Sequence, residues 1–309
     1  MNLYSKVAND ISFRYKRFMN KIFQSNIFHQ VKLKVFLPLG FYDHSFLKKP
    51  LDDYWMNRIR DVMNCPDNKL IDRHFDAGSV KNGKQFMHNG IAVTLGGYYG
   101  EPIVQMLYKN KGVHEPQEEY AFGKVLPTMP VGAIMLEFGS YWSFYSIWFN
   151  KEVRDAKNFL VEPEVFNLMY GINNFRINKV KGHFTNAFIG KTSGIENYTP
   201  VICVDDYVNK NNIQFIDVLH SDIQGFEYDM LCGAINTIRH HKIGYVFIST
   251  HGNKVHYECI EFLTTNEFII LCNADEEDTY SVDGLIVARY KHYNGLDSIE
   301  ISLKSKQSV

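Results

Sequence analysis

The sequence predicts an α/β fold built on a mostly parallel sheet of seven strands that ends in a C-terminal antiparallel hairpin. After Pro130, short apolar runs typical of buried strands alternate with stretches of helical periodicity, a pattern typical of parallel sheets with crossover helices. The last two runs, residues 268–271 and 285–288, follow each other without a convincing helix, which predicts the hairpin. Residues 1–84 lack this alternation and are predicted to form a mainly helical N-terminal extension before a domain at residues 85–309.

The composition allows a large packed core, because 45% of the residues are hydrophobic and 15% are aromatic. The chain has 33 basic and 34 acidic residues, so it has no overall charge that would attract nucleic acid or an anionic membrane. Its five cysteines are scattered without a CxxC pair, which argues against a disulfide framework or structural zinc and indicates a reducing compartment. With no apolar signal segment and no stretch that could span a membrane, a cytoplasmic protein is expected.

The N-terminal extension is predicted to begin with a basic amphipathic helix. Apolar side chains recur at helical spacing from Ile11 to Phe23 among arginines and lysines. Such a helix either docks on its own domain or contacts a membrane or partner, and a homo-oligomer could form through it. A second helix is predicted at residues 51–63, before Pro66, and the turn-forming residues 76–83 mark the domain boundary.

Local patterns predict the remaining elements. Residues 87–93 are typical of a short hairpin or edge strand, residues 101–110 of a helix, and Pro116 of the first turn of another helix. In the sheet domain, strands are expected at residues 133–138, 159–161, 184–189, 215–219, 245–249, 268–271 and 285–288. Helices are expected at residues 142–150, 164–173, 226–239 and 254–265.

Two strand ends indicate a nucleoside pocket. The first strand ends before Gly139, where a missing side chain lets a ligand approach the backbone and the next helix offers free amides. Glu162 closes the following strand, about 20 residues further on, where dinucleotide-binding folds place a ribose-binding acid. A carboxylate there can accept hydrogen bonds from both ribose hydroxyls. A tight turn and a solvent-facing glutamate would give the same pattern, but we favour the ribose role.

The chain has no phosphate-binding loop, since neither GxGxxG nor GxxxxGK[ST] occurs. Gly139 is followed by Ser140, Tyr141 and Trp142, and such bulky side chains would crowd a pyrophosphate. The pocket therefore favours an adenosine with a small charged tail, such as S-adenosylmethionine, over NAD or ATP.

The stretch from Gln214 to Ala234 reads QFIDVLHSDIQGFEYDMLCGA and predicts a buried strand, an acidic turn and a helix. Its carboxylates would lie at the carboxyl end of the sheet, where open α/β folds bind ligands. The acids could also merely cap the helix, so this stretch alone does not decide between the two interpretations.

Five segments in the same order resemble the successive motifs of the FkbM family of S-adenosylmethionine-dependent methyltransferases. They read GAIMLEFGSYWSFYS, VEP, NFRIN, FIDVLHSDIQGFEYDMLCGA and DGLIV, and the likeness covers residues 86–290. The resemblance implies a Rossmann-like class I methyltransferase fold and methyl transfer to hydroxyl groups, mostly on sugars and natural products. Within the family likeness, the Asp-Ile-Gln-Gly-Phe-Glu block is the most specific part.

The resemblance also implies site residues. Glu137 and Gly139 would border the methionine moiety, Glu162 would take the ribose, and Asp222 would lie beside the transferring methyl group. The cofactor-binding set is Glu137, Gly139, Ser140, Tyr141, Glu162 and Asp222. The acceptor-binding set is His114, Glu115, Tyr141 and Glu227, with Glu227 supporting the wall of the site. The acceptor would be a small molecule or a glycan.

The predicted strand at residues 245–249 brings His251 to the same sheet edge as Asp222. Imidazole titrates near neutrality, so His251 is the candidate general base for the acceptor hydroxyl. Alternatively, Asp222 and His251 hold a divalent cation that acidifies this hydroxyl, or His251 bonds only to backbone. Asp283 lies either near the acceptor or in a turn before the last strand, and we favour the turn.

Two departures from the family pattern support a second hypothesis. Gln224 stands where the family usually has glutamate, and Ser143 stands where glycine is common. A protein with these changes could be a non-catalytic module that kept the methyltransferase fold and binds carbohydrate in its aromatic groove.

Overall fold

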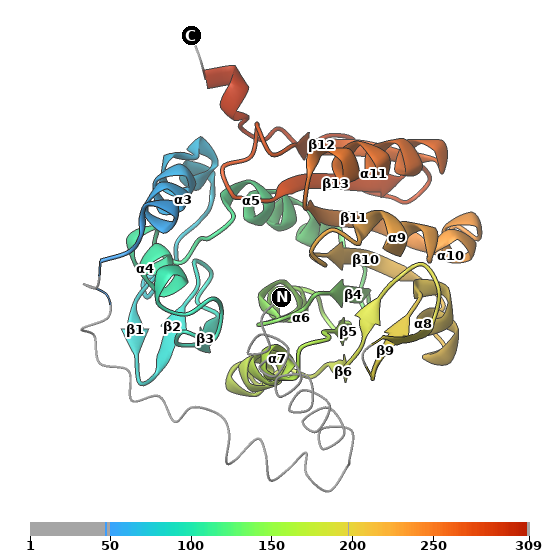
Figure 1. Cartoon of the computed structure of the whole chain (residues 1–309), viewed down its shortest axis with the longest axis horizontal. Helices are drawn as coiled ribbons and strands as arrows, with labels where there is room; N and C mark the ends of the chain where they lie inside the picture. The colour runs from blue at the N-terminus through green and yellow to red at the C-terminus, as the bar shows by residue number, and fades with distance from the viewer. Residues whose placement is uncertain (1–46, 48–49, 197, 308–309) are drawn as a thin grey trace, which may run out of the picture.

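The computed structural model describes residues 47, 50–196 and 198–307, and Figure 1 shows how the elements are arranged. The amphipathic helix predicted between Ile11 and Phe23 lies outside the described residues, as does any contact it makes with a partner or a second copy. Among the helices of the described part, none has the length and apolar character that a membrane span requires.

The main sheet has seven strands, as predicted. They are β4 (Ile134–Phe138), β5 (Lys157–Val161), β6 (His183–Thr185), β10 (Ile216–Ser221), β11 (Ile243–Thr250), β12 (Phe268–Ala274) and β13 (Gly284–Tyr290). Their order across the sheet is β12-β13-β11-β10-β4-β5-β6. The strands from β11 to β6 are parallel, while β13 runs antiparallel to both β11 and β12. The terminal antiparallel hairpin is therefore confirmed.

Helices cover both faces of this sheet (Figure 1). One face carries α5 (Pro116–Val125), α6 (Phe144–Glu152) and α7 (Val165–Asn178). The other face carries α8 (Val204–Lys210), α9 (Glu227–Cys232), α10 (Ile235–Arg239) and α11 (Asn253–Thr265). Successive strand residues point to opposite faces, so Met135 of β4 joins the first core while Leu136 and Phe138 join the second. Burial on both faces explains why the strands read as continuous apolar runs.

The N-terminal part packs beside α5. Its helical elements are α3 (Asp53–Asn64), the 3₁₀ turn η2 (Pro66–Leu70) and α4 (Glu101–Lys109). Its antiparallel strands are β1 (Val80–Lys81), β2 (Lys84–Phe86) and β3 (Ala92–Thr94). The 3₁₀ turn η3 (Leu126–Thr128) follows α5. The hairpin of β1 and β2 spans the predicted boundary at residue 84. Ile59 and Val62 of α3 share one hydrophobic core with Phe122 and Phe247. The division into two domains stays a prediction.

Two predicted elements divide in the structure, each because of contacts with distant parts of the chain. Residues 184–189 are split between β6 and β7 (Phe188–Ile189), which pairs with β9 (Thr199–Ile202) in a second sheet that also holds β8 (Gly194–Glu196). The predicted helix at residues 226–239 is divided into α9 and α10. The Asp205 carboxylate accepts hydrogen bonds from the backbone N–H groups of Asn236 and Thr237 and so caps α10 separately.

Candidate functional site

A cavity of about 390 Å³ lies at the carboxyl ends of β4, β5 and β10. Parallel strands bring their carboxyl ends to one edge, and the residues that follow these strands line the cavity. Four of the six residues predicted to bind the cofactor are among them: Gly139, Tyr141, Glu162 and Asp222. Much of the remaining wall of the cavity is apolar and consists of Val161, Ala187, Phe188, Ile189, Ile223 and Phe226.

Glu162 presents a buried carboxylate to this cavity. Its Oε2 accepts a hydrogen bond from the Tyr141 backbone N–H (3.2 Å), and its Oε1 accepts one from the Glu164 backbone N–H (2.9 Å). The residue is 5% exposed, and burial raises its pKa to about 7. Two backbone donors therefore fix the orientation of the carboxylate while the cavity leaves it accessible to a ligand.

Gly139, which follows β4, packs closely against the backbone of Asp222, which follows β10. It adopts φ +72°, and a Cβ placed there would lie 1.7 Å from the carbonyl oxygen of Asp222. The Asp222 N–H donates in turn to the Phe138 carbonyl (3.0 Å). Glycine is thus required by the close approach of the Asp222 backbone, in addition to any approach of a ligand.

Glu137 and Ser140, the other two predicted cofactor residues, are buried and are not among the residues that line the cavity. Glu137 lies opposite His220 in the sheet, and burial raises its pKa to about 7. The Ser140 N–H donates to the Val161 carbonyl (3.1 Å), while its Oγ has no hydrogen-bond partner among the described residues. Their role in binding the cofactor stays a prediction.

Aromatic rings from the loop between β3 and α4 form one wall of the cavity. Tyr98 and Tyr99 both line it, and their rings lie 4.9 Å and 5.5 Å from the ring of Tyr141. Tyr98 also stacks on Trp142 at 4.4 Å with an interplanar angle of 4°. Nothing in the sequence distinguishes these rings from the other tyrosines, because their grouping depends on how the loop packs.

His251 lies at the centre of a group of carboxylates, as the distances show. Its Nδ1 donates to Glu227 Oε1 (2.9 Å), and its Nε2 lies 3.1 Å from Asp283 Oδ1 and 3.5 Å from Asp222 Oδ1. Burial alone would lower the pKa of His251, but the hydrogen bond to Glu227 and the charges of Asp222 and Asp283 raise it to about 9. The imidazole is therefore a cation at neutral pH.

The pKa values of the two aspartates are raised as well. Burial and the charge of Asp283 raise the pKa of Asp222 to about 7, and burial raises the pKa of Asp283 to about 6. A turn was the favoured interpretation of Asp283, and its carboxylate also contacts His251 directly. A place near the acceptor, the other interpretation, stays a prediction. The described residues contain no group of three or more ligating side chains arranged to hold a metal ion.

Glu227 positions the loop between β10 and α9. It has no exposed surface, and its Oε1 accepts hydrogen bonds from the N–H groups of Ile223 (3.3 Å) and Gly225 (3.0 Å) as well as from His251. A side chain so placed holds the acidic turn in shape. Its contacts agree with the predicted support of the wall, whereas direct contact with an acceptor would need surface that it does not have.

The structure accommodates both departures from the family pattern. Ser143 adopts φ 62°, a left-handed conformation in which glycine is favoured by about 1 kcal/mol. Gln224 adopts φ 57°, and its amide lies 3.1 Å from Asp222 Oδ1 and 2.8 Å from His251 Nε2. Gln224 therefore joins the polar group around His251 instead of pointing away from it.

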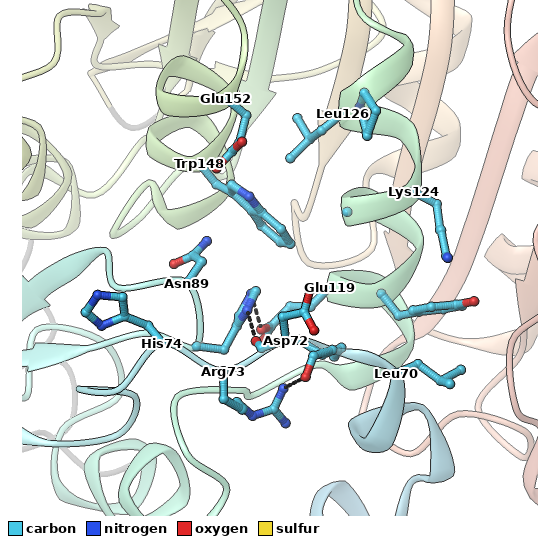
Figure 2. A pocket seen from close by; sticks show the side chains of 15 residues that line it. Leu70, Asp72, Arg73, His74, Asn89, Glu119, Lys124, Leu126, Trp148 and Glu152 are labelled. Atoms are coloured by element: carbon cyan, nitrogen blue, oxygen red, sulfur yellow. Dashed lines mark hydrogen bonds and ion pairs between the residues drawn. The ribbon is translucent and has the colours of Figure 1, made fainter.

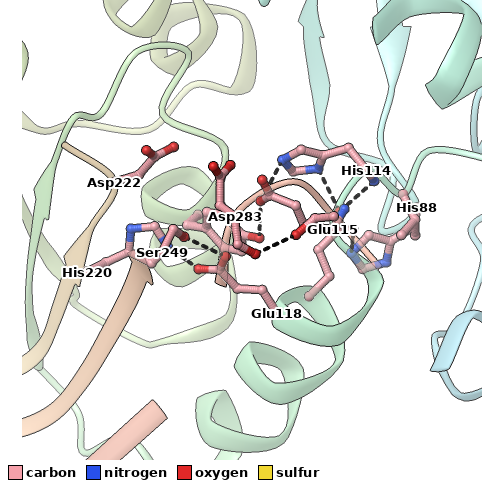
Figure 3. Close-up of polar contacts among 12 residues, drawn as sticks. His88, His114, Glu115, Glu118, His220, Asp222, Ser249 and Asp283 are labelled. Atoms are coloured by element: carbon pink, nitrogen blue, oxygen red, sulfur yellow. Dashed lines mark hydrogen bonds and ion pairs between the residues drawn. The ribbon is translucent and has the colours of Figure 1, made fainter. Parts of the chain in front are cut away.

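His114 and Glu115 belong to a buried polar network at the start of α5 (Figure 3). His114 binds Glu115 (3.0 Å) and Glu119 (2.6 Å), and Glu119 also binds His88 (3.2 Å). Burial would lower the pKa of His114, but the charges of Glu115 and Glu119 raise it to about 10. Glu115 is only 6% exposed and also accepts a hydrogen bond from the Tyr145 hydroxyl (3.0 Å). These contacts stabilise the helix start, and acceptor binding by either residue stays a prediction.

Glu118 extends this network to the sheet. Its Oε1 binds His220 Nε2 (2.7 Å) on β10, and its Oε2 accepts from the Ser249 hydroxyl (3.0 Å) on β11 (Figure 3). The helix α5 is thereby connected to the two strands that carry Asp222 and His251. The sequence predicted a helix beginning at Pro116, which includes Glu118, but it gave no sign of these partners, because they lie 102 and 131 residues away.

A second, larger cavity of about 630 Å³ lies between α5, α6 and the segments around residues 70–74 and 88–89 (Figure 2). Trp148 and Tyr120 line it, together with charged side chains that include Arg73, Lys124 and Glu119. None of the predicted site residues lines it. The motifs converge on the smaller cavity instead.

Residues 137–277 match the family model of the methyltransferase FkbM domain. This range includes the glycine turn, Glu162, Asp222 and His251. Together with the parallel sheet and its antiparallel last strand, the match defines a Rossmann-like class I S-adenosylmethionine-dependent methyltransferase. The match agrees with the resemblance to the FkbM family found in the sequence, and it covers the part of the chain from Glu137 to Glu277.

Solved structures of methyltransferases are similar to this chain at low sequence identity. The precorrin-6y C5,15-methyltransferase from Geobacter metallireducens GS-15 is 11% identical over 56% of this chain and 87% of that chain, with a TM-score of 0.40. The ribosomal protein L11 methylase from Lactobacillus delbrueckii subsp. bulgaricus is 10% identical over 58% and 81%, with a TM-score of 0.41. TrmK of M. capricolum, in complex with S-adenosyl-homocysteine, is 12% identical over 58% and 71%, with a TM-score of 0.39. A search of curated proteins gave no match.

Proposed function

We propose that this protein transfers a methyl group from S-adenosylmethionine to a hydroxyl group of a sugar, glycan or similar polyhydroxylated acceptor. One observation carries the proposal. A pair of carboxylates with raised pKa values, Asp222 and Asp283, shares the His251 cation at the edge of the cavity that Glu162 lines. An acceptor hydroxyl needs a proton acceptor at this place, and the carboxylate pair provides one.

The cavity suits S-adenosylmethionine, which when bound supplies the methyl group. Glu162 offers two carboxylate oxygens to the ribose hydroxyls, and its orientation is fixed by the Tyr141 and Glu164 amides. Phe188, Ile189 and Ile223 provide an apolar surface for the adenine ring of S-adenosylmethionine. The cavity volume of about 390 Å³ lies within the range of small-molecule sites.

We assign the general base to Asp222 and a positioning role to His251. A cationic imidazole with both nitrogens beside carboxylates cannot accept another proton, so the geometry argues against the general-base role expected for His251. Asp222 has a pKa of about 7 and lines the cavity, so its carboxylate can take the hydroxyl proton as the oxygen gains its methyl group. His251 holds Asp222 and Asp283 in place and offsets their repulsion.

The aromatic wall supports a sugar as the acceptor. Tyr98, Tyr99 and Tyr141 line the cavity together with Asp222, and the partly exposed rings of Tyr99 and Tyr141 can contact the apolar face of a sugar ring. Tyr99 is 45% exposed, so the wall opens to solvent and can admit an acceptor.

Two measurements test the proposal. Calorimetry should detect binding of S-adenosylmethionine and S-adenosylhomocysteine to the full chain, and Glu162→Ala should weaken both. Incubation with a pool of glycans and small sugars should give products that carry one added methyl group. Asp222→Asn should lower this activity by about 100-fold or more with S-adenosylhomocysteine binding retained. Absence of binding to the folded wild type would refute the proposal, and glycan binding without methyl transfer would support the non-catalytic module.

A further inference from the structure

Arg58 is a half-buried arginine whose guanidinium has one buried nitrogen, Nε, without a hydrogen-bond partner among the described residues. It lies on α3, where its Cζ is 5.2 Å from the centre of the Trp55 ring. Arg73 and Arg289, which are also buried or half-buried, both donate hydrogen bonds to protein oxygens. Since a buried polar atom without a partner is uncommon in folded proteins, the free Nε of Arg58 marks a place where a ligand can bind.

The contacts of α3 place Arg58 near the aromatic wall of the cavity. The Trp55 ring that supports the guanidinium lies 6.5 Å from the ring of Tyr99, which lines the cavity. Tyr99 in turn contacts Tyr98 (4.7 Å) and Tyr141 (5.5 Å), both part of the same wall. The guanidinium is therefore held at the outer side of the aromatic wall.

The charge of Arg58 acts on residues from three different segments. Burial raises the pKa of Tyr99 to about 12 and that of Asp283 to about 6, and Arg58 opposes both shifts. The pKa of Glu115 is lowered to about 2 against the effect of burial, first by His114 and also by Arg58. Arg58 is thus close enough to these residues for its charge to matter, although Nε bonds to none of them.

We infer that the acceptor carries an oxyanion, a carboxylate or a phosphate, which pairs with Arg58 while the neighbouring hydroxyl faces Asp222. The inference rests on the proposed methyl transfer. A neutral sugar would leave Nε of Arg58 without a hydrogen-bond acceptor beside the aromatic wall. A planar guanidinium held against Trp55 matches the two oxygens of a carboxylate or phosphate, which is the usual task of arginine in anion recognition. The acceptor class is then an acidic or phosphorylated sugar.

The inference also gives the N-terminal part of the chain a function. Glu162, Asp222 and His251 all belong to the range that matches the family model, residues 137–277, whereas α3 lies far outside it. Cofactor binding and proton transfer would then reside in the family domain. Recognition of the acceptor's charge would come from α3.

Matched acceptor pairs provide the test. A neutral glycoside, the corresponding uronic acid and the corresponding 6-phosphate are compared as acceptors for the full chain and for Arg58→Gln, Arg58→Lys and Arg60→Gln. Arg60 lies on the same helix but is exposed and bonds only to Asn57 within the described residues, so its variant is the control. Affinity for S-adenosylhomocysteine and the urea midpoint are measured for each variant.

The wild type is expected to favour one or both anionic acceptors over the neutral glycoside by about tenfold or more in kcat/KM. Arg58→Gln should remove this preference, leave the neutral acceptor unchanged and keep the affinity for S-adenosylhomocysteine. Arg58→Lys should retain part of the preference, since lysine keeps the positive charge but lacks the paired N–H donors of the planar guanidinium. A preference for only the uronic acid or only the phosphate identifies which oxyanion is recognised.

Three outcomes would overturn the inference. The first is equal methylation of neutral and anionic acceptors by the wild type. The second is an equal loss with both acceptors in Arg58→Gln, and the third is loss of S-adenosylhomocysteine binding in both Arg58 variants, which would give Arg58 a structural role. Methylation of no acceptor at all would instead refute the proposed function, so the two failures are distinguishable.

Discussion

The Asp283 carboxylate lies 3.1 Å from Nε2 of His251, whose other ring nitrogen donates to Glu227. The pairing of β11 with β13 explains this contact. Thr250 lies opposite Gly284 in the antiparallel register, so the residue after Thr250 and the residue before Gly284 must leave the sheet side by side. The sheet itself thus brings the His251 ring and the Asp283 carboxylate together, close to Asp222.

This relationship predicts the pH dependence of methyl transfer. Asp222 must be ionised to accept a proton, and its pKa of about 7 is raised by burial and by the charge of Asp283. The rate should therefore fall as the pH decreases below about 7. Asp283→Asn removes one negative charge, lowers the pKa of Asp222 and should shift the acidic limb of the kcat profile to lower pH. An acidic limb at the same pH in both proteins would contradict this assignment.

The affinity for S-adenosylhomocysteine should also depend on pH, but through Glu162. Its pKa is raised to about 7 by burial, and the ionised form is the better acceptor for two ribose hydroxyls. Below pH 7 the affinity should fall by up to about tenfold per pH unit, because the carboxylate must first lose its proton. Calorimetry between pH 5.5 and 8.5 measures this. Glu162→Gln should bind more weakly at neutral pH and show a flat profile; a slope unchanged in this variant would assign the titration to another group.

His251 should stabilise the fold at neutral and acidic pH but not at alkaline pH. Its pKa is about 9 in the folded protein against 6.5 ordinarily. A raised histidine pKa contributes stability that is fully present below about pH 6.5 and is lost as the pH rises through about 9. The difference in urea midpoint between wild type and His251→Ala should thus be larger at pH 6 than at pH 9.5. His292→Ala, on an exposed loop, is the control, and a difference independent of pH would argue against the cationic state.

Replacing Gly139 with alanine should disrupt the site through its backbone. A Cβ there would lie 1.7 Å from the Asp222 carbonyl oxygen, in addition to the strain of φ +72°. Gly132 is the matched control, because it has φ +79° but nothing within 4 Å of the added Cβ. Gly132→Ala should lower the free energy of unfolding by about 1 kcal/mol. Gly139→Ala should lower it by about 3 kcal/mol or more and abolish cofactor binding, as urea unfolding and calorimetry would show. Equal costs at the two positions would contradict the contact with Asp222.

Much of the fold was predictable because the strands of a parallel sheet are buried on both faces and therefore stand out in the sequence as continuous apolar segments. Gly139, Glu162 and Asp222 were predictable for the same reason, since each directly follows such a run and parallel strands share one edge. Local patterns could not predict the division of the helix at residues 226–239, because the cap that starts α10 comes from Asp205.

The remaining site residues depend on contacts that local sequence does not encode. Asp283 reaches His251 only through the register of an antiparallel pair, and the glycine after it is equally typical of a plain turn. The pKa of His251 follows from the three carboxylates around it, so an isolated histidine at a strand end suggested a base when the structure places a cation. Arg58 lies on a helix whose packing against the aromatic wall has no signal in its own residues.

The contact between Gly139 and the Asp222 backbone limits how this enzyme can diverge. A Cβ at Gly139 would collide with the Asp222 backbone, so the glycine turn and the segment that carries the proposed catalytic carboxylate form a single block. New acceptors would have to be accommodated by the segments that only border this block. The loop between β3 and α4, which carries Tyr98 and Tyr99, and the helix α3 are such segments. Exchanging these two segments between related enzymes is the direct way to alter which acceptor is bound.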